Sequence, residues 1–198
     1  AVVGGLFEDG KVRPTAAGSE GAGKCRGWLL GVTGKKSAYK PQTLVLQLWG
    51  QDASGKSAYE AIFTGLHLQL NRPYFVAAAI NLKDASDKGV TFYVKDLAND
   101  EEPLGVYSTT HKVVRMQGAS SPLTIGGVGG TAERAWDGMI DDVRLSRAAL
   151  PKNRLQVFAA QEATKDTVGF WRFEPSPGLL HDSSGNGLTL QRLRGARA

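Results

Sequence analysis

Apolar and polar residues alternate along much of this chain, and this period of two constrains its fold more than any other feature. The alternation is clearest at 66–70 and 90–95, and leucine takes every second position from 44 to 48. Successive side chains of a β-strand point to opposite faces, so the pattern predicts strands with one buried face. The predicted strands are, in chain order, 28–32, 44–49, 59–63, 66–70, 74–82, 90–95, 112–116, 123–125, 139–145 and 168–173. Residues 4–27 predict one or two weak strands and a long loop.

Turn-forming residues separate these segments. The chain has 25 glycines among its 198 residues, and segments 50–56, 83–89 and 96–103 carry Gly, Asp, Asn and Pro, which favour hairpin-like turns. Residues 153–163 have apolar side chains at helical spacing and predict one short α-helix. Many strands with a single helix indicate an all-β fold, an antiparallel two-sheet β-sandwich, and the length is sufficient for one domain with a buried core.

The run 136–150 carries a more specific signal. A short strand places Ile140 and Val143 beside the doubled aspartate at 141–142. Strict alternation would put Ile140 and Val143 on opposite faces, so we expect a one-residue bulge at the two aspartates to bring both inward. The pattern reads aromatic-x-Gly-x-Ile-Asp-acidic-Val-Arg, followed by a polar segment and Ala-Leu.

This run resembles the closing motif of laminin-G-like domains in the concanavalin A-like lectin/glucanase superfamily. Residues 121–127 are similar to the strand that precedes it in that family. Residues 168–174, followed by Asp-Ser-Ser-Gly-Asn-Gly at 182–187, are similar to a motif that usually opens such a domain. The resemblance covers 25–190 and implies a jelly-roll sandwich of the kind appended to large bacterial secreted multidomain proteins.

The position of the last motif leaves two arrangements open. We expect one domain over 1–198, with an irregular segment at 1–24 and a closing strand and turn at 168–190. In the alternative, the last motif begins a neighbouring copy. The first is favoured because no other segment of the chain is a candidate for that strand.

Composition restricts the partners. The net charge of +5 is dispersed along the chain, without basic runs interleaved with aromatic residues, so we expect no nucleic-acid partner. No apolar run approaches about 18 residues, so no membrane span is expected. The single cysteine, Cys25, rules out a disulfide within the chain.

Two sequence patterns bear on catalysis. Gly50–Ser57 matches the phosphate-binding pattern G-x-x-x-x-G-K-[ST]. That chemistry needs a helix beginning at Lys56, and the β-prone residues 59–63 instead indicate a hairpin loop. Retaining glycosidases need two carboxylates about 5–5.5 Å apart, whereas Glu60 stands alone in its strand. We therefore expect no enzyme; a glycoside hydrolase with another carboxylate pair and a nucleotide hydrolase using Lys56 remain the alternatives.

The resemblance also implies calcium at the rim of the sandwich, bound by loop carboxylates and carbonyls. The available ligands are Asp137, Asp182 and Asn186. Calcium takes about 6–8 oxygen ligands, and one carboxylate per loop supplies few of them. The alternative role of these side chains is to stabilise tight turns by bonding nearby backbone N–H groups.

Aromatic side chains are the candidates for sugar binding, since a ring can stack on the apolar face of a pyranose. Trp49 lies at a strand end beside a loop, and Tyr59 lies across the predicted hairpin. Together they are the expected platform, with a core position for Trp49 as the alternative. The predicted function is a non-catalytic recognition module of a larger extracytoplasmic protein, with a carbohydrate polymer or glycosylated surface as its ligand. The alternative is docking on other domains of the parent protein without sugar binding.

Overall fold

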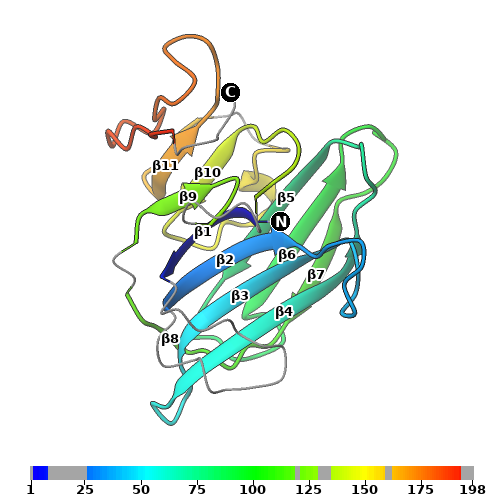
Figure 1. Ribbon diagram of the computed structural model, residues 1–198, viewed down its shortest axis with the longest axis vertical. Coiled ribbons are helices and arrows are strands. Elements are labelled where there is room, and N and C mark those ends of the chain that lie inside the picture. The colour runs from blue at the N-terminus through cyan, green and yellow to red at the C-terminus, as the bar shows by residue number, and fades with distance from the viewer. Residues whose placement is uncertain (1, 9–25, 119–120, 129–134, 159–161, 193–198) are drawn as a thin grey trace. The chain divides into compact units, whose positions relative to one another are not determined.

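The computed structural model describes residues 2–8, 26–118, 121–128, 135–158 and 162–192 (Figure 1). These residues form antiparallel β-sheets and no α-helix, which confirms the all-β prediction. Contacts along the chain divide it into two compact units, 1–137 and 138–198. The expectation of one domain over 1–198 stays a prediction.

The first unit contains a six-stranded sheet in which the strand order is β4-β3-β2-β1-β9, and β8 pairs with β3 (Figure 1). All of its pairings are antiparallel. β3 is flanked on both sides and is the most deeply buried of the strands of this sheet whose burial is described. The strands are β1 (Val2–Glu8), β2 (Arg26–Val32), β3 (Thr43–Gln51), β4 (Ser57–His67), β8 (Arg115–Met116) and β9 (Leu123–Ile125).

The same unit contains a three-stranded antiparallel sheet in the order β5-β6-β7. Its strands are β5 (Tyr74–Ile80), β6 (Val90–Asp96) and β7 (Gly105–Thr109). The sequence does not predict β7. The segment 74–82, predicted as a strand covered on both faces, forms β5 over 74–80 and is half-buried at every position of both faces.

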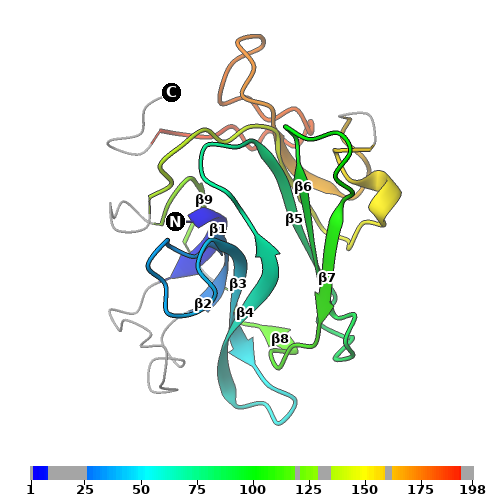
Figure 2. The ribbon, with the colours of Figure 1, turned by 90° about the vertical axis from the view of Figure 1, so that its right-hand side faces the viewer.

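One hydrophobic cluster takes its side chains from both sheets of the first unit, which face each other in Figure 2. The leucines of β3 at positions 44, 46 and 48 are at most 1% exposed, and Val90 and Phe92 of β6 are fully buried. These residues occupy alternate positions of their strands, so each strand turns one face to the cluster. The alternation in the sequence therefore located the core of this unit.

Other predicted strands differ from the observed ones at their ends. β4 joins the predicted segment 59–63 to the beginning of 66–70 and ends at His67. Leu68 lies outside the strand but is buried in the main cluster, and residues 69–72 are exposed, so the second predicted strand is wrong beyond His67. Of the predicted segment 112–116, only Arg115–Met116 forms a strand.

The second unit contains β10 (Val143–Ser146) paired antiparallel with β11 (Thr167–Trp171). The predicted bulge at 141–142 is wrong, because both aspartates precede β10 and Asp142 has a left-handed φ of 49°. The irregularity in pairing lies instead between Leu145 and Ser146. The strand predicted at 168–173 is confirmed by β11, apart from its ends.

The predicted helix at 153–163 is also wrong. Lys152–Arg154 form a short 3-10 helix, and Leu155 returns to extended backbone with φ −69° and ψ 147°. Residues 159–161 lie outside the described residues. No helix of the described residues has the length and apolar character that a membrane crossing requires.

Candidate functional site

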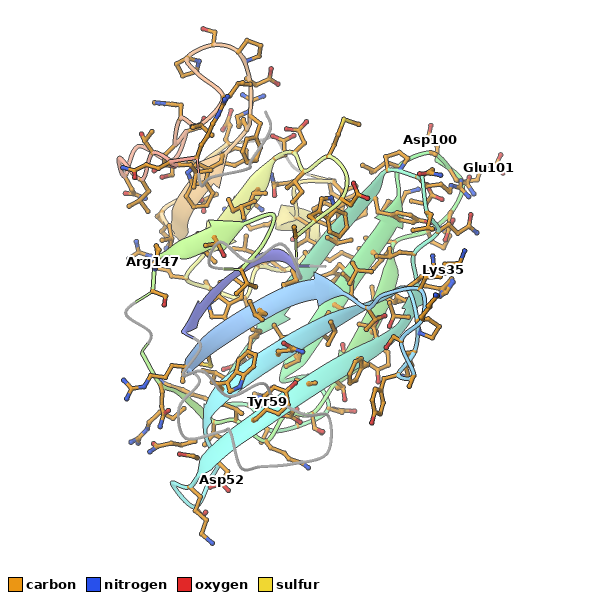
Figure 3. All side chains as sticks on the ribbon, viewed as in Figure 1. Lys35, Asp52, Tyr59, Asp100, Glu101 and Arg147 are labelled. Atoms are coloured by element: carbon orange, nitrogen blue, oxygen red, sulfur yellow. The ribbon has the colours of Figure 1, made fainter. Side chains whose placement is uncertain are left out.

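The six-stranded sheet has a second face, opposite the main core. Because side chains alternate along a strand, Val45, Gln47 and Trp49 of β3 point away from the buried leucines. In the register of the sheet they pair with Phe63, Ala61 and Tyr59 of β4, respectively. Figure 3 shows Tyr59 on this face, which is turned to the viewer, with the three-stranded sheet behind it. Aromatic residues therefore recur along β4 on one side of the sheet.

Trp49 is part of a core on this face. Its side chain is 1% exposed and belongs to a second hydrophobic cluster with Leu29 and Val128. The Tyr59 ring packs against it, with centroids 5.0 Å apart and an angle of 35° between the planes. The expectation that Trp49 forms an exposed platform is therefore wrong, because residues of β2 and of the segment after β9 cover it. Tyr59 is half-buried at the border of this cluster.

The same face carries a second aromatic pair, which the sequence did not predict. Tyr39, from the loop between β2 and β3, stacks on Phe63 of β4 with ring centroids 5.9 Å apart and an angle of 21°. Tyr39 is 51% exposed, whereas Phe63 is half-buried beneath it. A nearly parallel pair with one open ring presents a flat apolar surface to solvent.

Hydrogen bonds fix the loop that carries Tyr39. The hydroxyls of Thr33 and Thr43 both donate to the carbonyl of Lys40, at 2.6 and 2.8 Å, and the Thr43 amide donates to the Thr33 hydroxyl at 3.0 Å. Tyr39 itself donates its amide to the Ser37 hydroxyl at 3.2 Å. Lys40 has a left-handed φ of 40°, a conformation that the two threonine bonds to its carbonyl stabilise. The ring is therefore held in place before any ligand arrives.

We define the aromatic strip as Tyr39, Gln47, Tyr59, Ala61 and Phe63. Tyr59 and Phe63 are four residues apart on one strand, which corresponds to roughly 13 Å. Gln47 and Ala61 lie between them and are half-buried. The glutamine amide offers both donors and an acceptor, and alanine is a small side chain. The strip thus combines flat rings with a polar group in a row.

The predicted calcium ligands are divided between the two units. Asp137 is an exposed residue of the first unit, whereas Asp182 and Asn186 belong to the second. Within the described part of the chain, no group of three or more His, Cys, Asp or Glu side chains is arranged to hold a metal ion. The structure therefore brings two of the three predicted ligands into one turn.

Asp182 is 2% exposed and holds that turn together. One carboxylate oxygen accepts the amides of Phe170 at 3.0 Å and Ser184 at 2.9 Å. The other accepts the Leu188 amide at 2.9 Å and the Ser184 hydroxyl at 2.8 Å. Burial alone would raise the pKa of this carboxyl, but the four hydrogen bonds outweigh burial and lower the pKa to about 2. Both oxygens already have protein donors, as a turn-stabilising role requires.

Asn186 uses its side chain as a donor. The amide nitrogen donates to the carbonyls of Thr167 at 3.1 Å and Val168 at 2.9 Å, and these residues belong to β11. Its backbone amide donates to the Ser184 hydroxyl at 3.2 Å. Asp182 and Asn186 therefore join the turn 182–188 to β11 from two directions. The turn-forming role that the sequence left open matches these contacts.

The segment Gly50–Ser57 is a β-hairpin. Asp52, at the hairpin tip in Figure 3, accepts the amides of Ser54 at 2.9 Å and Lys56 at 3.1 Å. The Ser54 hydroxyl also donates to this carboxylate, and this bond is the main cause that lowers the pKa of Asp52. β4 begins directly after Lys56, where a phosphate-binding loop would begin a helix. The hairpin interpretation of this motif is confirmed.

Glu60 has a structural partner. Its side chain lies on the core side of β4, because it pairs with Leu48. The carboxylate accepts the backbone amide of Lys112 at 2.6 Å, which ties the segment before β8 to the sheet. No second carboxylate accompanies it in β4. This strand therefore lacks the carboxylate pair of a retaining glycosidase.

Comparisons with known proteins give no relative. No protein-family model, curated protein or solved structure matches this chain. The aromatic strip is therefore interpreted from its own geometry.

Proposed function

We propose that this chain is a non-catalytic recognition module that binds carbohydrate through the aromatic strip. Its fold is proposed to be a concanavalin A-like β-sandwich of the laminin-G-like type, part of a larger extracytoplasmic protein. Two observations support the fold: the two sheets of the first unit share one hydrophobic cluster, and β10 and β11, which carry the two family-like motifs, pair with each other.

The observation that carries the binding proposal is the Tyr39–Phe63 pair. An exposed aromatic ring is normally a cost, because it keeps apolar surface in contact with water. Here the ring is held by a hydrogen-bonded loop and supported from below by a second ring. A preformed flat surface binds a ligand without losing its own conformational freedom, and this makes it suited to stack on the apolar face of a pyranose.

The length of the strip favours an oligosaccharide over a monosaccharide. Tyr59 and Phe63 are roughly 13 Å apart, which is longer than one sugar ring. Gln47 lies between them on the neighbouring strand and can bond hydroxyl groups through its amide. We therefore propose a polysaccharide segment that lies along β4, with rings at two positions and a polar contact between them. The strip contains no carboxylate, so calcium has no part in the proposed contact.

A glycan-array screen with paired variants tests this proposal. Tyr39→Ala removes the exposed ring, and we expect binding to weaken about tenfold, equivalent to ~1.4 kcal/mol. Tyr39→Phe keeps the ring, and its binding is expected to stay within about twofold of the original chain. The matched control is Val106→Ala, because Val106 is 49% exposed and lies on β7, in the other sheet of the same unit. Its binding should not change.

Two results would reject the proposal. One is binding by a folded Tyr39→Ala variant with the affinity of the original chain. The other is the absence of binding to any glycan, which would favour the docking function on other domains of the parent protein.

A further inference from the structure

The six-stranded sheet has two very different edges. At one end β9 has only 3 residues, whereas at the other end β4 has 11. In Figure 1, β4 is the outermost strand of this sheet, with β3 as its neighbour on one side. A long edge strand offers a row of backbone donors and acceptors to another strand.

The hairpin shows which residues of β4 turn their backbone groups outward. The Asp52 amide donates to the Lys56 carbonyl at 2.9 Å, so these residues form a hydrogen-bonded pair. Bonded and non-bonded pairs alternate along an antiparallel ladder, so Gln51 and Ser57 form a non-bonded pair. A second hydrogen bond agrees with this assignment. The Gln51 carbonyl accepts the Val114 amide at 2.9 Å, so the backbone of Gln51 is bonded on the side away from β4.

The same alternation places the N–H and C=O groups of Ala61 and Phe63 on the open edge. Both residues lie within the regular part of the register, which shifts only between Thr43 and Val45. Within the described residues, no hydrogen bond joins the outward backbone groups of Ala61 and Phe63 to another segment.

This edge carries few of the features that usually prevent strand pairing. Natural edges are protected by short strands, lysine, proline or inward-pointing charges beside the edge. Ser57–His67 contains no Lys, Arg or Pro, and Glu60 is its only acidic residue. The Glu60 carboxylate is engaged by the Lys112 amide on the core side of the sheet. The charge nearest to Ala61 is therefore a single carboxylate on the core side, and it already has a hydrogen-bond partner.

We propose that β4 pairs antiparallel with β4 of a second copy of this chain, about a two-fold axis at Ile62. In this register Ala61 exchanges both backbone hydrogen bonds with Phe63 of the second copy, and the reciprocal pair does the same. Ile62 faces its own equivalent on the core side, where side chains of a non-bonded pair approach closely.

The charges along β4 favour a second copy of this chain as the partner that pairs with its open edge. The register places each Glu60 opposite Thr64 of the other chain, so no like charges face each other across the new ladder. The pairing is isologous and closes at two chains, so it removes the open edge without forming a filament. It also brings the two aromatic strips side by side, because Phe63 of one copy lies opposite Ala61 of the other. This inference goes beyond the proposed function and does not depend on it.

The test is the solution mass of the full chain by size-exclusion chromatography with light scattering, over a range of concentrations. We expect twice the monomer mass, falling to the monomer on dilution. Ala61→Pro should be monomeric: proline removes the outward N–H, and this position of an edge strand tolerates it because the bonds to β3 are unaffected. Ala61→Lys should also be monomeric, because it places two ammonium groups beside the axis.

Val106→Lys is the control. Val106 is 49% exposed on β7, an edge strand of the other sheet, so its variant should remain a dimer. Circular dichroism checks the fold of each variant, and if Ala61→Pro does not fold, Ala61→Lys decides. A monomeric original chain overturns the proposal, as does a dimer that persists in a folded Ala61→Lys variant. Loss of glycan binding in Tyr39→Ala would leave this result unchanged.

Discussion

Asp182→Ala is expected to lower the free energy of unfolding by about 3–5 kcal/mol. The substitution leaves the amides of Phe170, Ser184 and Leu188 without their acceptor, and each buried unsatisfied donor costs about 1–3 kcal/mol. Urea denaturation followed by circular dichroism measures the change. Asp182→Asn keeps one oxygen and should cost less. A loss below about 1 kcal/mol for the alanine variant would show that water replaces this network without cost.

The same carboxylate predicts a dependence of stability on pH. Its pKa is about 2 in the folded chain, below its ordinary value of 3.8. A depressed pKa means that the folded state binds the proton less readily than the unfolded state, so the stabilisation is complete above the ordinary value. It should fall by ~2 kcal/mol as pH decreases from 3.8 towards 2. The Asp182→Asn variant should lack this part of the acid dependence.

Trp49→Ala is expected to destabilise the first unit by about 3–5 kcal/mol, the usual cost of truncating a large buried aromatic side chain. Trp49 is 1% exposed and packs with Leu29, Val128 and Tyr59. The contrasting variant is Tyr39→Ala, whose side chain is 51% exposed and whose loss should change stability by no more than about 0.5 kcal/mol.

These two variants distinguish a residue of the core from a residue of the binding face. The account requires that Trp49→Ala affects unfolding and that Tyr39→Ala affects glycan binding. A reversal, in which the Trp49 variant is fully stable and the Tyr39 variant unfolds, would mean that the assignment of core and platform is wrong. Urea unfolding curves of both variants, measured under the same conditions, give the answer.

The sequence predicted the central strands well. In β3 and β6 every second residue is apolar and belongs to the main cluster, so their sequences carry a period of two. β7 was missed because Gly105–Thr109 is short and has few apolar residues. The helix predicted at 153–163 was wrong because turns can also place apolar residues at helical spacing, and extended backbone at Leu155 ends the 3-10 helix.

The binding face was harder to predict, because periodicity does not reveal what covers a strand end. Val128 lies far from Trp49 in the chain, yet the two share one cluster. Tyr39 lies in a loop, where alternation has no meaning, and its position depends on hydrogen bonds among Thr33, Lys40 and Thr43. The only signal for it was an aromatic residue among polar loop residues.

The most direct test of the central claim is chemical-shift mapping by NMR with the glycan that the array identifies. The account predicts that the largest perturbations fall on Tyr39, Gln47, Ala61 and Phe63, with smaller changes at Tyr59. Perturbations concentrated away from the aromatic strip would contradict the proposed function, even if the chain binds the glycan tightly.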